Sequence, residues 1–169
     1  TDSFTRACPL FGTLIALLHE GQPILGAINL PVSDQLCIGD CSDTKINGIS
    51  TKIRNSIPLA EAIVLASAID TIQEYQSWER FEILLKQTKL FRTWGDCYGY
   101  FLLAGGWVDI MLDPIMNPWD IMALVPIIQG AGGVITDWRG NDVVQGASCI
   151  AANPVLHPIV LEILNMQRR

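Results

Sequence analysis

The stretch from Asp113 to Asp120 has the residue types and spacing best suited to chemistry. It places one carboxylate at the end of an apolar run, Val108–Leu112, and a second seven positions later. Between them, Asn117-Pro118 predicts a helix start, because Asn is a favoured N-cap and Pro suits the first helical position. Asp120 would then lie in the first turn, where it could hold a hard cation or a polar substrate, or merely complement the helix dipole. Spacing alone favours neither interpretation.

A further acid, Asp96, stands at another predicted helix start, after a strand expected at residues 89–93. Taken alone, it is best explained as an N-cap whose side chain turns to the backbone. However, both acid-bearing helix starts follow strands of the same α/β region, and the carboxyl ends of such strands tend to line one crevice. We therefore expect Asp96 to face a cleft together with Asp113 and Asp120.

The elements that must position these acids fall into two regions, 1–59 and 60–169. In the first, antiparallel strands are predicted, followed by a loop and connector at residues 39–58. In the second, strands alternate with helices, which indicates a layered α/β domain. The strands are expected at 11–18, 24–30, 35–38, 62–66, 89–93, 107–112, 134–136 and 148–151, and the helices at 72–86, 96–104, 118–130 (kinked at Pro126) and 156–166.

Other candidate motifs are better explained by structure. The glycines of Gly130-Ala131-Gly132-Gly133 follow a helix and precede a strand, whereas a phosphate loop has the opposite order, so we expect a helix C-cap and a tight turn. Asp109 and Asp137 are expected in packing or turn roles. Thr1-Asp2-Ser3-Phe4 alone reads as a frayed terminus or a helix cap.

Composition limits the classes of function. Half of the 169 residues are hydrophobic and the net charge is −6, without a basic run, so neither a nucleic acid nor a membrane is an expected partner. An anionic substrate would need a metal or helix N-termini to reverse the local field. The five cysteines form no C-x-x-C pair, which favours a reduced, cytoplasmic protein.

Several of these stretches together resemble the inositol monophosphatase superfamily of metal-dependent phosphomonoesterases, and most of all its histidinol-phosphatase branch. The likeness covers essentially the whole chain. Its motifs are Thr1-Asp2-Ser3-Phe4, Pro9 to Leu17, Gly95-Asp96-Cys97-Tyr98, Asn117-Pro118-Trp119-Asp120, and Gln129 to Trp138. The resemblance implies an αβαβα sandwich of the sugar/inositol phosphatase type, with the first part of the N-terminal antiparallel domain missing.

The resemblance also implies roles for single residues. Asp120 matches a Mg²⁺ ligand, Asp113 matches a contact to the alcohol part of the substrate, and Asp96 and Cys97 match a substrate-pocket segment, where an acid could hold an amino group. Thr1 matches the threonine that orients the attacking water. The expected reaction is hydrolysis of a small phosphate monoester, above all L-histidinol phosphate. Members of the superfamily are usually homodimers, so the resemblance also implies a homodimer.

The same resemblance places a glutamate and two aspartates of the catalytic centre before Thr1. One Asp cannot supply the octahedral oxygen coordination that Mg²⁺ prefers, so we expect the 169-residue chain alone to be inactive. Two alternatives stay open. One is an inositol-1-monophosphatase or a related sugar or nucleotide phosphatase, and the other is a non-catalytic binding or dimerisation module that has lost the metal site.

Overall fold

The structure is a computed structural model that describes residues 2–166, and its strands form two five-stranded sheets. The first sheet follows the short helix α1 (Asp2–Thr5) and has its strands in chain order. Its strands are β1 (Thr13–His19), β2 (Gln22–Leu30), β3 (Gln35–Gly39), β4 (Thr44–Ile46) and β5 (Ile49–Thr51), and every neighbouring pair is antiparallel. The predicted hairpin of two apolar strands is therefore confirmed.

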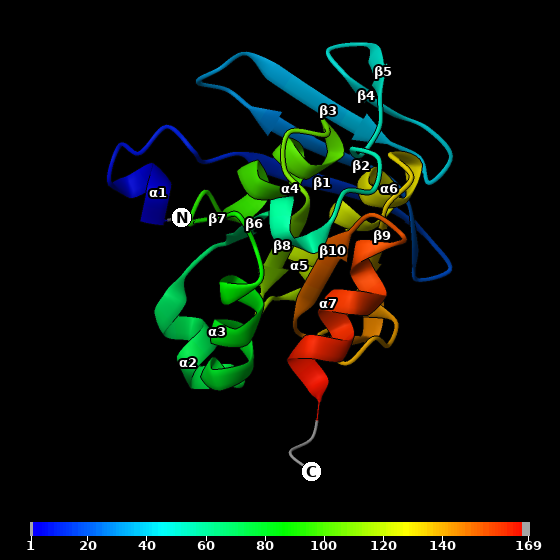
Figure 1. Cartoon of the computed structure of the whole chain (residues 1–169). Helices are drawn as coiled ribbons and strands as arrows, with labels where there is room; N and C mark the ends of the chain where they lie inside the picture. The colour runs from blue at the N-terminus through cyan, green and yellow to red at the C-terminus, as the bar shows by residue number, and fades with distance from the viewer. Residues whose placement is uncertain (1, 167–169) are drawn as a thin grey trace.

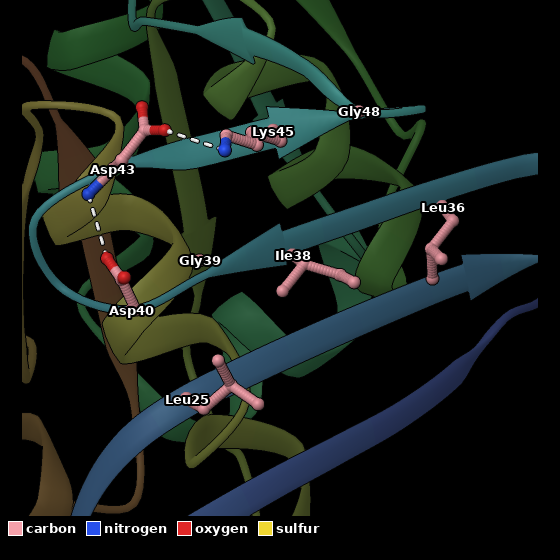
Figure 2. Close-up of a pocket in the computed structure, with 8 residues that line it drawn as sticks. All are labelled: Leu25, Leu36, Ile38, Gly39, Asp40, Asp43, Lys45 and Gly48. Atoms are coloured by element: carbon pink, nitrogen blue, oxygen red, sulfur yellow. Dashed lines mark hydrogen bonds and ion pairs between the residues drawn. The ribbon is translucent and has the colours of Figure 1, made fainter.

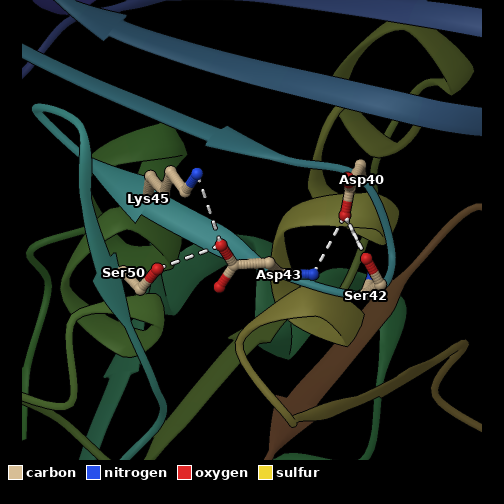
Figure 3. Close-up of polar contacts among 5 residues, drawn as sticks. All are labelled: Asp40, Ser42, Asp43, Lys45 and Ser50. Carbon is tan, nitrogen blue, oxygen red and sulfur yellow. Dashed lines mark hydrogen bonds and ion pairs between the residues drawn. The ribbon is translucent and has the colours of Figure 1, made fainter.

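The expected loop at residues 39–58 is wrong for residues 44–51, because β4 and β5 form a hairpin there. Its turn is Asn47-Gly48, and both residues have positive φ (49° and 82°), the backbone that a two-residue hairpin turn requires. The preceding corner is fixed by side chains: Asp40 accepts the backbone N–H groups of Ser42 and Asp43, and Asp43 accepts the hydroxyl of Ser50 (Figure 3). Each strand has only three residues, too few for a visible alternation of apolar side chains.

The second sheet has the strand order β7-β6-β8-β10-β9. The strands β6 (Ile63–Ala66), β7 (Leu90–Arg92) and β8 (Ile110–Asp113) are parallel, whereas β10 (Cys149–Ala152) runs antiparallel to β8 and to β9 (Val134–Thr136). Because β6, β7 and β8 run in the same direction, the residues that follow them lie at one edge of the sheet.

Helices cover both faces of the second sheet (Figure 1). One face packs on α4 (Asp96–Ala104) and α6 (Leu124–Gly130), which also contact the first sheet, and the other face packs on α2 (Ile69–Tyr75), α3 (Trp78–Lys86) and α7 (Leu156–Asn165). The remaining helical segments are the 3₁₀ turns Leu59–Glu61 and Val143–Gln145 and the short helix α5 (Pro118–Ile121). The described residues therefore form the layers β, α, β, α of the predicted sandwich. The boundary at residue 59 stays a prediction.

Two predicted helices are each interrupted. The helix expected at 72–86 is divided by Ser77, whose hydroxyl accepts the backbone N–H of Arg80 and begins α3. The helix expected at 118–130 is divided between α5 and α6, so the predicted kink at Pro126 is wrong. Pro126 is the third residue of α6, where its missing N–H costs no helical hydrogen bond. Within residues 2–166, no helix is long and apolar enough to cross a membrane.

The outer face of the first sheet is apolar and open. Leu25, Leu36 and Ile38 point away from the helices, as Figure 2 shows, and each residue is 39 to 41% exposed. Ile15 and Leu17 of β1 belong to the same face, since the register pairs Leu17 with Leu25. In the described part of the chain no helix covers this face.

Candidate active site

A cleft of about 650 Å³ opens at the edge of the second sheet where β6, β7 and β8 end. Its lining includes Asp96, Cys97, Asp113 and Asp120. The prediction that the acids following parallel strands face one cleft is therefore confirmed. Thr1, the predicted catalytic hydroxyl, lies outside the described residues.

Asp113 is the last residue of β8 and is 4% exposed. The Tyr100 hydroxyl donates a hydrogen bond to its Oδ2 over 2.8 Å, and the side chain and backbone of Ser67 lower the pKa of the carboxyl group through hydrogen-bonding interactions. Burial raises the pKa of Asp113 to about 7, although these hydrogen bonds act in the opposite direction. The cleft therefore holds a carboxyl group that changes its charge near neutral pH.

Asp96 is the first residue of α4, and Gly95 is the N-cap. The Asp96 carboxylate accepts a hydrogen bond from the Ser3 hydroxyl over 3.3 Å and lines the cleft. The expected N-cap role is thus taken by Gly95. The backbone of Asp96 has φ of 54°, in the left-handed region that residues with a side chain rarely adopt, and such strained positions concentrate at functional sites.

Cys97 follows Asp96 and forms part of the cleft wall, and the residue is 7% exposed. Burial, followed by the charge of Asp96, raises the pKa of its thiol to about 11. At neutral pH the side chain is therefore a neutral thiol and a poor nucleophile. Its Sγ lies so close to Gly12 that a Cβ atom there would be 2.7 Å away, so its contribution to the cleft is shape.

Asp120 lies in the first turn of α5, where Asn117 is the N-cap and Pro118 the first helical residue, as predicted. Its Oδ2 accepts the backbone N–H of Asn117 over 3.4 Å, and the side chain lines the cleft. Among the described residues, no three His, Cys, Asp or Glu side chains converge as a metal site would require.

Sequence reasoning assigned neither Ser67 nor Tyr100 to the site. Ser67 follows β6 directly, so the rule that led to Asp96 and Asp113 also pointed to it. Tyr100 lies one helical turn after Asp96 and is fully buried. Its hydroxyl, which needs a partner when buried, was the available signal for a polar role.

The other candidates lie outside the cleft, as predicted. Asp109 is fully buried and forms an ion pair with Arg54, and Asp137 accepts the backbone N–H groups of Arg139 and Asn141 in a turn. The glycines from Gly130 to Gly133 end α6 and turn into β9, as a C-cap and tight turn should. They form no phosphate loop.

Charge in the cleft has one sign. Among the described residues, the side chains that line it include the carboxyl groups of Asp96, Asp113 and Asp120 and no Lys, Arg or His. Such a lining attracts metal cations and ammonium groups and repels a bare phosphate ester.

Comparisons with known proteins agree with this arrangement. The model of the inositol monophosphatase family matches residues 1–168. The chain is 39% identical over 152 residues to the bifunctional phosphatase IMPL2 of Arabidopsis thaliana, covering 89% of this chain and 44% of that protein. It is 34% identical over 155 residues to a histidinol-phosphatase of Chlorobaculum parvum, covering 90% of this chain and 60% of that protein.

A solved structure is similar as well. An inositol monophosphatase from Zymomonas mobilis superimposes with a TM-score of 0.84 and 29% identity, covering 98% of this chain and 66% of that one. The chain thus spans about half the length of the first two curated relatives that it matches.

Proposed function

Because the chain belongs to the inositol monophosphatase family, we propose that the full-length protein hydrolyses L-histidinol phosphate to L-histidinol and phosphate. The observation that carries this proposal is the cleft lined by the carboxyl groups of Asp96, Asp113 and Asp120 without a described cationic side chain. L-Histidinol has an ammonium group, for which two carboxylates are natural partners. Relatives named histidinol-phosphatase support the same substrate.

The phosphate group needs positive charge that the described residues do not supply. We propose that Mg²⁺ supplies it, with Asp120 as one ligand and the others from the part of the relatives' length that this chain does not match. Mg²⁺ prefers oxygen ligands in octahedral geometry, which one carboxylate does not complete. Thr1 is proposed to orient the attacking water.

In this proposal the remaining cleft residues bind the alcohol part of the substrate. Asp96, at the mouth of the cleft, accepts hydrogen bonds from the ammonium group, and Asp113, at its floor, adds negative charge. Cys97 forms the wall beside them as a neutral thiol. Water attacks phosphorus, the P–O bond to the alcohol breaks, and the alcohol oxygen gains a proton, so the products are the alcohol and inorganic phosphate.

A second candidate is an inositol-1-monophosphatase, which has support from a 29% identical relative with that name in Caulobacter vibrioides. The two activities differ in the charge of the alcohol, because inositol has no ammonium group. Homodimer formation, expected from the resemblance, stays a prediction.

Side-by-side turnover by the full-length protein with Mg²⁺ tests the proposal. We expect kcat/KM to be higher for L-histidinol phosphate than for D-inositol 1-phosphate, and Asp96→Asn to reduce this preference. A higher kcat/KM for inositol phosphate would contradict the proposed substrate and favour the second candidate. Turnover of neither ester would favour a non-catalytic module.

A further inference from the structure

Ser67 lies between Asp96 and Asp113, two of the three acidic residues that line the cleft. It follows β6 directly, and the pairing of Ala66 with Leu112 brings Ser67 level with Asp113 at the end of the neighbouring strand. On its other side, α4 begins with Gly95 and Asp96. This serine therefore joins the ends of three segments that are far apart in the sequence.

Its hydroxyl interacts with both acidic residues. The backbone N–H of Asp96 donates to Ser67 Oγ over 2.9 Å. The side chain and backbone of Ser67 also lie where they favour the ionised form of Asp113 and lower its pKa. A serine hydroxyl has one hydrogen to donate and two lone pairs that accept. It can therefore accept from Asp96 and donate to Asp113 at the same time.

The contact between Ser67 and the start of α4 is too close for any residue except glycine at position 95. A Cβ atom added to Gly95 would lie 2.2 Å from Ser67 Cα. The next residue, Asp96, has the left-handed backbone described above, which persists only where its surroundings hold it. The hydrogen bond from the Asp96 N–H to Ser67 Oγ is one of the contacts that hold this backbone in place.

We propose that Ser67 is a positioning residue that holds Asp96 and Asp113 together as one binding site for the ammonium group of the substrate. This inference rests on the proposed function for the identity of the ligand. Ser67 acts through the two acids: it fixes the turn that directs Asp96 into the cleft, and it favours the charged form of Asp113.

The effect of Ser67 on the charge of Asp113 can be measured directly as the pKa of the Asp113 carboxyl group. Burial, and to a smaller extent the charge of Asp96, raises the pKa of Asp113, while the interactions with Ser67 lower it. The other titratable groups that face Asp113 are Tyr100 and Cys149, both buried and both with a raised pKa. In Ser67→Ala the hydroxyl is lost, so the pKa of Asp113 should rise above its value near 7 and the neutral form should dominate at neutral pH.

The experiment compares Ser67→Ala with Ser77→Ala in the full-length protein. Ser77 is a matched control because its hydroxyl also accepts one backbone N–H, at the start of α3, and it does not line the cleft. The pKa of Asp113 is measured by NMR titration of the labelled carboxyl carbon. In parallel, KM is measured for L-histidinol phosphate and for D-inositol 1-phosphate at pH 7 and pH 9.

For Ser67→Ala we expect a raised Asp113 pKa and, at pH 7, a KM increase of about tenfold for histidinol phosphate only. The increase should shrink at pH 9, where Asp113 is again ionised. Ser77→Ala should match the wild type in both measurements. An unchanged Asp113 pKa in Ser67→Ala, or an equal KM change for both esters, overturns the inference. If the pKa rises but the wild type hydrolyses neither ester, the link between Ser67 and Asp113 stands and the proposed function fails.

Discussion

The Tyr100 hydroxyl donates a hydrogen bond to Asp113 over 2.8 Å at the floor of the acidic cleft. Both side chains are buried, and the Cys149 thiol lies against the same hydroxyl. Burial, followed by the charge of Asp113, raises the pKa of Tyr100 well above its usual value, so the phenol stays protonated and keeps its donor role. Tyr100 is therefore always the donor of this hydrogen bond, and Asp113 is always the acceptor.

Tyr100→Phe should raise the pKa of Asp113 further, because the phenol hydrogen bond stabilises the ionised form. A buried carboxyl group without this donor becomes protonated at higher pH. The measurement is NMR titration of the Asp113 carboxyl carbon in both proteins. Tyr98→Phe is the control, since Tyr98 stacks on Phe101 and has no described bond to Asp113. An equal pKa of Asp113 in wild type and Tyr100→Phe would contradict the prediction.

Asp113 should make stability fall as pH rises. Its pKa is raised from 3.8 in the unfolded chain to about 7 in the folded one, so between these values the folded state binds more protons. Under that condition the free energy of unfolding decreases with pH. The Asp113 carboxyl group then leaves the free energy of unfolding unchanged below pH 4 and lowers it by on the order of 4 kcal/mol above pH 7. This figure uses about 1.4 kcal/mol per tenfold change in proton affinity.

Asp113→Asn removes this dependence, because an amide does not ionise. We expect the variant to unfold at a higher urea concentration than the wild type at pH 8 and to lose that advantage at pH 4. Asp70→Asn is the control, since Asp70 is exposed at the start of α2. A constant difference between wild type and Asp113→Asn at both pH values would contradict the raised pKa.

The cleft was predictable because it depends on strand direction. Once Asp96 and Asp113 are assigned to the ends of parallel strands of one sheet, geometry brings them to one edge. The helix start at Asn117 was predictable for a local reason, its capping preference. The polar network was not, because the bond between Ser67 and Asp96 joins residues that are 29 positions apart. No local pattern reports such a distance.

The helix breaks are tertiary effects as well. The chain between α5 and α6 passes directly over Gly26 of β2, where an added Cβ atom would lie 1.9 Å from the Ala123 carbonyl oxygen. Packing of the two sheets around α6 fixes this segment, whereas the apolar pattern of the sequence continues through it. By contrast, Asn47-Gly48 was a readable hairpin signal, and the short strands beside it obscured its meaning.

Arg54→Met should destabilise the fold strongly. Arg54 holds Asp109 through its Nε and Nη2 atoms, and Asp109 is fully buried while 37% of the Arg54 side chain is exposed. Without Arg54 a buried carboxylate keeps only the backbone N–H of Ile63 as a described partner. Breaking such a pair costs about 3–5 kcal/mol, which urea unfolding would measure as a lower transition midpoint.

The control for Arg54→Met is Lys86→Met. Lys86 forms an ion pair with Glu82 one helical turn away, and both side chains are exposed, so its loss should cost less than about 1 kcal/mol. Similar urea midpoints for the two variants would contradict the structural role given to Asp109. The pair matters for the cleft as well, because Asp109 precedes the strand β8 that carries Asp113.

Asp120→Asn, compared with Asp70→Asn, separates the two interpretations of an acid in a first helical turn. Both residues lie in the first turn of a short helix, but only Asp120 lines the cleft. If Asp120 merely complements a helix dipole, the two substitutions should have similar, small effects on stability and none on turnover.

If Asp120 is a Mg²⁺ ligand, its amide variant loses charge at the metal. In the full-length protein, Asp120→Asn should then reduce kcat by about 100-fold at low Mg²⁺ and shift the Mg²⁺ dependence to higher concentration, whereas Asp70→Asn should keep the wild-type curve. Near-normal turnover of Asp120→Asn at low Mg²⁺ would assign this carboxylate to the helix alone.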